Sequence, residues 1–283
     1  MNDNFDLALR GDIYSRGSWR ANVTTDYAKR YKYSGAFSLS YAQTRTISST
    51  DYNPLVQKDF KVDWTFNQQT KARPNTRFAI SVQAGTSHYN KLYSYSYGNY
   101  LNNTYNSSIS FHQNFKGTPF HLDLLLGHSQ NINNHTIDFN LPTGSITMDR
   151  INPFKRKIQI GDARWYEKIS FNYRADFVNS LSTKDNLLFT QENILGQCKN
   201  GFHQSIPLST TFRVFKYINI SPSLNYDGYF YLKTIRKSWD SVAEKMDTTF
   251  VNGFRDAEIL NGNISMNTTI YATYSFNKGK LLA

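Results

Sequence analysis

The clearest pattern of hydrophobic and polar residues runs from Phe60 to Gly85, where two stretches alternate with a period of two. Aromatic or aliphatic residues fill every second position, and polar or charged residues lie between them. The large apolar positions are Phe60, Val62, Trp64, Phe66, Phe78, Ile80 and Val82. Strict alternation places each set on one face of a β-strand. Residues 71–75 (KARPN) supply turn residues, so the segment is predicted to form an antiparallel hairpin.

The same alternation recurs along the chain and predicts an all-β protein of about twelve antiparallel strands. The other clear cases are residues 5–13, 19–27, 37–41, 105–111, 120–126, 137–139, 169–177, 206–214, 218–226 and 260–274. The pattern weakens over 142–166, where a basic connector is predicted around 153–157. Pro207 and Pro222 cannot donate to a ladder, so they are expected to weaken pairing locally.

The predicted connections alternate in length. Short, mostly basic turns are expected near 29–34, 68–75, 115–119 and 215–217, and long polar loops near 46–58, 87–101, 180–201 and 235–256. Short turns at one end and long loops at the other are typical of an outer-membrane barrel. Predicted strands of about 9–13 residues also suit a tilted membrane strand, whereas strands in soluble sheets usually have about 5–6 residues.

Aromatic residues near the predicted strand ends support the same interpretation. Trp and Tyr gather at both membrane interfaces of such barrels; here they are Trp19, Tyr27, Tyr41, Trp64, Tyr105 and Tyr173. The prediction is therefore an antiparallel transmembrane β-barrel in the outer membrane, with the apolar positions of 60–82 facing lipid. A soluble, glycan-binding β-sandwich has the same alternation and stays open as an alternative.

Composition narrows the classes of protein further. No stretch approaches the roughly 20 apolar residues of a membrane helix. The net charge of +11, from 32 Lys plus Arg against 21 Asp plus Glu, favours anionic partners. Cys198 is the single cysteine, so an internal disulfide is excluded. Residues 1–6 lack the features of a signal peptide, and the chain is expected to be a fragment of a longer one.

Motifs for catalysis are absent from the sequence: it has no HExxH, no GxSxG, no P-loop and no GxGxxG before a helix. His121 and Asp123 share a predicted strand face, and we interpret them as polar wall residues rather than a catalytic pair. No catalytic residue, metal site or cofactor is predicted. Basic and aromatic residues at 30–33 and 164–166 could stack on bases. Their place at strand ends fits interfacial side chains better, so no nucleic-acid partner is expected.

Cations occupy polar positions of several predicted strands and alternate with Asp6, Asp12, Asp26 and Asp176. Either the two signs neutralise each other along the wall, or they form a hydrated lining that tolerates a phosphorylated glycolipid head. The predicted lumen path comprises Arg10, Arg20, Lys61, Asp63, Arg77, Arg174 and Arg213.

Several blocks of sequence resemble one family. They are LRGDIYSRGSW (9–19), KRYKYSGAFSLSY (29–41), KARPNTRFAISVQAG (71–85), YLNNTYNSSISF (100–111), GTPFHLDLL (117–125), RWYEKISFNY (164–173) and HQSIPLSTTFRVFKYINISPSLNY (203–226). Together they are similar to the barrel of the LptD family, the outer-membrane lipopolysaccharide-assembly proteins, in the form found in Bacteroidota. The resemblance covers nearly the whole chain.

The resemblance implies a non-enzymatic barrel of Gram-negative bacteria that receives lipopolysaccharide from periplasmic bridge proteins and inserts it into the outer leaflet. It also implies a plug lipoprotein and contact with outer-membrane lipids. Residues 1–283 would be part of the barrel domain, without the family's N-terminal periplasmic jelly-roll and later strands. A general porin or nutrient-uptake barrel is the main alternative function.

The family's exit route is transferred only in part. Proteobacterial members weaken a seam with Pro in the first two strands, and no Pro lies between Phe5 and Tyr33. A seam along the strand that contains Phe5, Leu7 and Leu9 is therefore a hypothesis that rests on this being the first barrel strand. The family's inter-domain disulfides cannot form from Cys198 alone.

Overall fold

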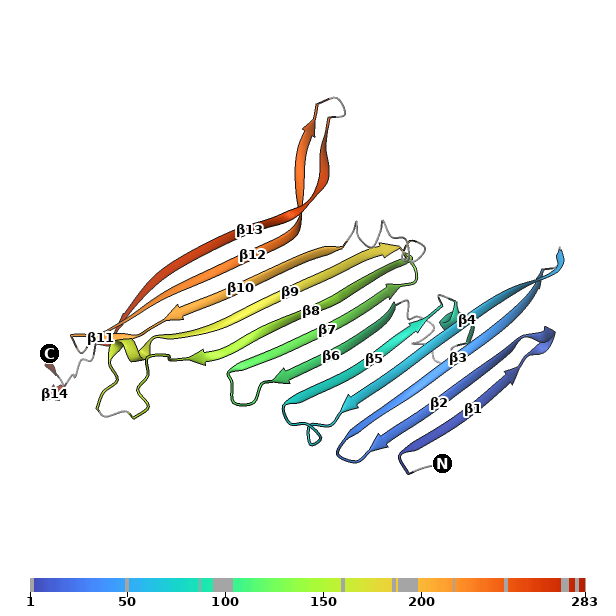
Figure 1. Ribbon diagram of the computed structural model, residues 1–283, viewed down its shortest axis with the longest axis horizontal. Coiled ribbons are helices and arrows are strands. Elements are labelled where there is room, and N and C mark those ends of the chain that lie inside the picture. The colour runs from blue at the N-terminus through green and yellow to red at the C-terminus, as the bar shows by residue number, and fades with distance from the viewer. Residues whose placement is uncertain are drawn as a thin grey trace.

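A single large antiparallel sheet makes up most of the computed structural model (Figure 1). The structure describes residues 3–48, 51–86, 88–93, 104–158, 161–184, 187, 198–215, 217–241, 244–270, 275–277 and 280–282. Thirteen strands form the large sheet, and a second sheet has two short strands, β14 (Ser275–Asn277) and β15 (Lys280–Leu282). The all-β prediction is confirmed.

The strands follow each other as a meander. The first eight are β1 (Phe5–Ile13), β2 (Trp19–Lys29), β3 (Tyr33–Ser48), β4 (Asp51–Gln68), β5 (Thr76–Gly85), β6 (Thr104–Asn114), β7 (Phe120–Asn131) and β8 (Thr136–Ile151). The others are β9 (Ser170–Lys184), β10 (Lys199–Ser209), β11 (Phe212–Val214), β12 (Ile218–Asp240) and β13 (Lys245–Thr268). β12 pairs with β10 and β11 and also with β13, so β1 and β13 form the two edges of an open sheet.

The helices are short. They are η1 (Ser15–Gly17), α1 (Tyr89–Tyr93) and η2 (Trp165–Lys168). Among the described residues, no helix has the length and apolar character to cross a membrane.

The hairpin predicted from the alternation is confirmed as β4 and β5. Trp64 pairs with Val82, and Phe66 pairs with Ile80, so the apolar residues of both strands share one face. Pairing with β3 and β6 continues this face in both directions, because Leu39 lies opposite Val62 and Phe78 opposite Phe111. One face of the sheet is therefore apolar, and the other carries the polar and charged positions.

No second sheet packs on the apolar face within the described residues, since the strands pair into one layer. Large hydrophobic side chains consequently remain exposed: 43 % of Phe60, 73 % of Leu9 and 65 % of Ile264. A β-sandwich would bury such residues between two sheets. The soluble-sandwich alternative is therefore wrong for this fold, and the exposed apolar face has the character of an interaction surface.

Two segments predicted to be long loops are strands. In 46–58, β3 and β4 continue and stay paired as far as Ser48 and Asp51. In 235–256, β12 and β13 stay paired as far as Asp240 and Lys245, and this hairpin projects beyond the rest of the sheet in Figure 1. A two-stranded ladder is held by the hydrogen bonds between its strands and does not need an apolar face, so the alternation that marked the other strands is weak there.

The segment after Pro142, where the alternation of apolar and polar residues is weak, also belongs to a strand. β8 continues through Pro142 to Ile151, and its register with β9 shifts between Asn140 and Gly144. A local irregularity accommodates a residue without an N–H, yet it breaks the strict period of two. The predicted strand over 206–214 is two elements, β10 and β11, separated at Thr210 and Thr211. The division into β10 and β11 raises the strand count of the large sheet from the predicted twelve to thirteen, whereas the continuation of β8 only lengthens a predicted strand.

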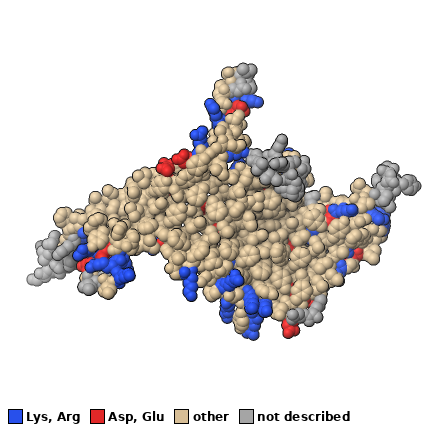
Figure 2. All heavy atoms as spheres, viewed as in Figure 1, with Lys and Arg blue, Asp and Glu red and all other residues tan. Residues whose placement is uncertain are grey.

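The predicted short turns are confirmed at one edge of the sheet, which is the lower edge in Figure 1. The loop predicted over 87–101 lies partly outside the described residues, as does most of the one over 180–201. Lys and Arg gather along the edge with the short turns, whereas the sheet surface toward the viewer is mostly uncharged (Figure 2). The sheet thus has two distinct faces and a basic edge.

Candidate functional site: the polar face of the sheet

Neighbouring strands bring one residue each into a row across the polar face. We call this the polar row; it comprises Arg77, His112, Asp123, Ser145, Asp176, His203 and Tyr229. The adjacent residues form a matching row on the apolar face, the aromatic row: Phe78, Phe111, Leu124, Gly144, Phe177, Phe202 and Phe230. Because successive side chains of a strand point to opposite faces, the two rows lie back to back.

Members of the polar row are joined by hydrogen bonds and ion pairs. His112 Nδ1 lies 2.5 Å from Asp123 Oδ1. The ring of His203 stacks on Tyr229 with centroids 4.5 Å apart, and its Nε2 lies 3.3 Å from Asp227 Oδ1. Arg174, on the same strand as Asp176, donates to both carboxylate oxygens of Asp176 at 2.7 and 2.8 Å. Each carboxylate named here is therefore held by a neighbouring side chain.

A second cluster lies where β1 and β2 meet. Arg20 is 6 % exposed and donates to Asp12 Oδ2 from Nε at 2.9 Å, and Arg10 donates to the other Asp12 oxygen at 3.0 Å. Arg20 also lies over the ring of Tyr93 in α1, 5.6 Å from its centroid. The short helix α1 therefore covers the polar face at this point and buries the guanidinium.

The predicted lumen residues do not form one cluster. Arg10 and Arg20 belong to the cluster at β1–β2, and Lys61 lies 3.4 Å from Asp63 in β4. Arg77 and Arg174 lie in or beside the polar row. Arg213 is in β11 at the edge with the short turns, where its Nε donates to Asn219 at 3.1 Å. All seven lie at polar positions, but they are spread over the whole width of the sheet.

The pair His121 and Asp123 is not a unit in the structure. His121 Nδ1 lies 2.7 Å from Asn114 Oδ1, and its Nε2 lies 2.9 Å from Asp149 Oδ2. Asp123 instead contacts His112. In the part of the chain that the structure describes, no group of three His, Cys, Asp or Glu residues could hold a metal ion. The polar face therefore offers cationic hydrogen-bond donors and anionic acceptors, as a surface that binds polar ligands does.

A cavity of about 740 Å³ is bordered by the central part of the polar row. Arg77, His112, Asp123, Arg174 and Asp176 are among its lining residues. The sequence did not predict that His112 and His203 belong to the polar row, because their neighbours depend on the register between strands. Their polar positions in alternating strands were the only indication in the sequence.

The family model described as "LptD protein" matches residues 1–283. A search of curated proteins gives no match. Among solved structures, the ferric yersiniabactin uptake receptor FyuA from Yersinia pestis is similar with 11 % identity and a TM-score of 0.26. The alignment covers 95 % of this chain and 45 % of the receptor, so the chain spans about half the receptor's length. A TM-score this low carries no argument about function.

Proposed function

Because this chain belongs to the LptD family, we propose that it forms part of an outer-membrane β-barrel that carries lipopolysaccharide to the outer leaflet. The family assignment places the chain in the outer membrane and among transport and assembly proteins. The match over residues 1–283 is the observation that carries the proposal. The function is non-enzymatic: the barrel binds and guides a lipid, and proteins upstream of it supply the energy.

The two faces of the sheet support this proposal physically. The apolar face, which includes Phe60, Val62, Trp64, Phe66, Phe78, Ile80 and Val82, contacts the acyl chains of the membrane. Of these side chains, Phe60 is 43 % exposed and Ile80 is packed among its neighbours at 8 %. The polar face lines the lumen, and its residues Arg10, Arg20, Lys61, Asp63, Arg77, Arg174 and Arg213 contact the sugar and phosphate groups. Paired charges of both signs suit a hydrated head group, because they bind it weakly enough to let it pass.

The open edges of the sheet determine what must complete the barrel. Unpaired N–H and C=O groups are not stable in the hydrocarbon region, so β1 and β13 need partner strands that lie outside this sheet. We propose that further strands of the full-length barrel pair with them. We also propose that β1, with Phe5, Leu7 and Leu9, forms one lip of the lateral exit. A periplasmic jelly-roll and bridge proteins would deliver the lipid to the barrel, and a lipoprotein would plug the lumen.

Depletion of the full-length protein in its own bacterium tests the function. Lipopolysaccharide should disappear from the cell surface and accumulate in the inner membrane, and re-expression should restore it. Unchanged surface lipopolysaccharide after depletion would contradict the proposal. Planar-bilayer recording separates the porin alternative, since a porin gives steady open channels and a plugged exporter stays mostly closed.

The seam and the lumen path are tested separately. A photo-crosslinker at Leu7 should react with the last strand of the full-length barrel, whereas the same group at Leu39, inside the sheet, should not. Crosslinks from Leu7 only to a non-terminal strand would remove the seam. Replacing Arg77 and Arg174 together by Gln should lower surface lipopolysaccharide at equal amounts of folded barrel. Arg73→Gln in the β4–β5 turn is the matched control.

A further inference from the structure

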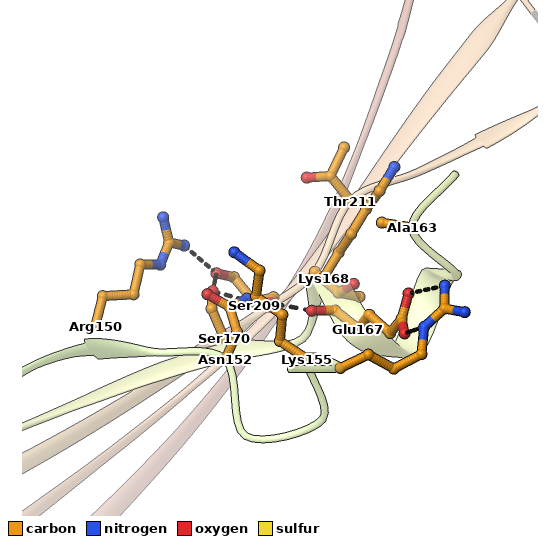
Figure 3. Close-up of a pocket in the computed structure, with 11 residues that line it drawn as sticks. Arg150, Asn152, Lys155, Ala163, Glu167, Lys168, Ser170, Ser209 and Thr211 are labelled. Atoms are coloured by element: carbon orange, nitrogen blue, oxygen red, sulfur yellow. Dashed lines mark hydrogen bonds and ion pairs between the residues drawn. The ribbon is translucent and has the colours of Figure 1, made fainter. Parts of the chain in front are cut away.

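A second cavity lies at the edge with the short turns, between the β8–β9 connection and the ends of β9 and β10 (Figure 3). Its volume is about 350 Å³, near the lower limit of typical small-molecule sites. The lining residues that could bind a ligand are Arg150, Lys155, Arg156, Lys168, Ser170, Ser209, Thr210 and Thr211. The lining therefore combines four cations with four hydroxyl groups.

The charge of this cavity is not balanced. Glu167 is the only carboxylate among the lining residues, and it is 4 % exposed. Arg156 donates to both of its oxygens, and the backbone N–H of Arg164 donates to Oε2 at 2.8 Å. The hydrogen bond from Arg156 holds the pKa of Glu167 below its usual range. One cation is thus neutralised, while Arg150, Lys155 and Lys168 make no ion pair among the described residues.

Of the three remaining cations, Arg150 is positioned by hydrogen bonds between side chains of the cavity wall. Arg150 Nη2 donates to Ser209 Oγ at 2.6 Å, and Ser209 Oγ lies 3.2 Å from the hydroxyl of the buried Ser170. Across the cavity, the Arg156–Glu167 pair fixes the irregular connection, and Thr210 Oγ1 donates to the carbonyl of Trp165 at 3.1 Å. Figure 3 shows Arg150 directed toward Ser209 from one side and the Glu167 pair on the other.

We propose that this cavity binds a phosphoryl group. A phosphate ester presents several strong acceptor oxygens and up to two negative charges. Such a group can take charge-assisted hydrogen bonds from Arg150, Lys155 and Lys168 together, with the hydroxyls of Ser209 and Thr211 as further donors. The volume suits a phosphate on a single sugar or glycerol unit. The site lies outside the predicted lumen path and does not depend on the lipid that the barrel transports.

The ligand can be a phosphomonoester, as on a phosphorylated sugar, or a phosphodiester, as in a phospholipid head group. The two differ in charge between pH 5 and 7.5, because only the monoester has a second pKa, of about 6. The compound with the lower Kd at pH 7.5 is the preferred ligand. Binding of the monoester should tighten from pH 5 to pH 7.5, whereas binding of the diester should not change. Either preference supports a phosphoryl site.

Calorimetry on the full-length protein in neutral detergent tests the proposal. The titrants are glucosamine 6-phosphate, glycerophosphoglycerol and inorganic phosphate, with uncharged N-acetylglucosamine as the blank. At least one phosphate compound should bind with a Kd below 1 mM. Arg150→Gln combined with Lys155→Gln should weaken binding at least tenfold. Lys116→Gln in the β6–β7 turn changes charge at the same edge but outside the cavity, and should leave binding unchanged.

Two further measurements keep the outcome decisive. Ser209→Ala preserves every charge but removes the contact that positions Arg150, so it should weaken binding about two- to fivefold even if the double variant does not fold. Migration of unheated samples on gels checks folding. Three results would overturn the proposal: no phosphate compound binds at 10 mM, all variants bind with equal affinity, or a hexaglutamate peptide binds more tightly than every phosphate compound. The last result would indicate that the ligand is an acidic protein segment.

Discussion

The polar row and the aromatic row occupy adjacent positions of the same strands, yet their side chains are stabilised in different ways. Asp123, Asp176 and His203 of the polar row contact other side chains of the same face. In the aromatic row, Phe202 contacts Phe230 at 5.8 Å between ring centroids, but the face as a whole is uncovered. One face therefore supplies its own polar partners, and the other is not covered by another layer of the described sheet.

This difference predicts where substitutions are costly. In the proposed barrel, a charge on the aromatic row enters the hydrocarbon region, where no group of the protein compensates it. In the same proposal, a charge on the polar row meets water and other charges in a lumen. Mutational cost should therefore change between neighbouring residues of one strand, and a protein buried on both faces would show no such alternation.

The largest effect is expected for Phe177→Arg compared with Val178→Arg. Phe177 belongs to the aromatic row, whereas the next side chain, Val178, is on the polar face and 49 % exposed. Arg at Phe177 should lower the free energy of unfolding by about 2–4 kcal/mol, and Arg at Val178 by about 0–1 kcal/mol. Urea titration of the full-length protein in phospholipid vesicles measures both. Equal losses would show that the apolar face does not contact lipid.

Gly144→Val should give the next largest effect. A Cβ at Gly144 would come within 2.6 Å of Phe177 Cζ and 2.5 Å of the carbonyl oxygen of Asp123. The glycine gives the Phe177 ring its space, so Val should cost about 1–3 kcal/mol through overpacking. Gly11→Val is the matched control, since nothing lies within 4 Å of a Cβ there. The same vesicle titration applies, and a neutral Gly144→Val would mean that the ring can move away.

The sequence predicts the faces of this sheet well, because a period of two fixes side-chain direction without knowledge of partners. It predicts the rows poorly. That Arg77 lies opposite His112, and Asp176 opposite His203, follows from the register of the hydrogen-bond ladder. Several registers keep the same faces, differing by two residues, so alternation alone cannot choose among them.

Two further features could not be predicted, for different physical reasons. The β12–β13 hairpin extends to Asp240 and Lys245 through backbone pairing that needs no apolar pattern. The cavity lined by Arg150, Lys155, Arg156 and Lys168 is bordered by the connection between β8 and β9, in which Glu167 pairs with Arg156 rather than with another nearby cation. This pairing depends on the path of the connection, and the sequence of 153–157 indicates only that the connection is basic.

On the polar row, Asp176→Asn should have a smaller effect. It removes the carboxylate that accepts two hydrogen bonds from Arg174, and both side chains are partly exposed. Exposed pairs contribute little, so the expected loss is about 0.5–1 kcal/mol in the vesicle titration. Asp138→Asn, at a polar position of β8, should be neutral. A loss above about 3 kcal/mol would mean that the polar face is dry, and the contrast between the rows would fail.

The smallest effect concerns Glu167, whose pKa is lowered chiefly by its hydrogen bond with Arg156. A carboxylate with a lowered folded-state pKa stabilises the fold above its ordinary value of 4.5 and loses that contribution as pH falls through the folded-state pKa. Acidification below pH 4.5 should therefore release the β8–β9 connection. Hydrogen exchange over residues 152–169, corrected for the intrinsic pH dependence, should show protection at pH 6 that declines toward pH 3.

Glu167→Gln separates this pair from general acid effects. The variant should lack the decline between pH 6 and pH 3, because the amide does not titrate, and its protection should be lower at pH 6 because the ion pair with Arg156 is gone. Strand β5 provides the internal reference, since none of its residues is Asp, Glu or His. If β5 loses protection in parallel with the connection, acid opens the whole sheet, and local pairing at the basic edge does not govern the response.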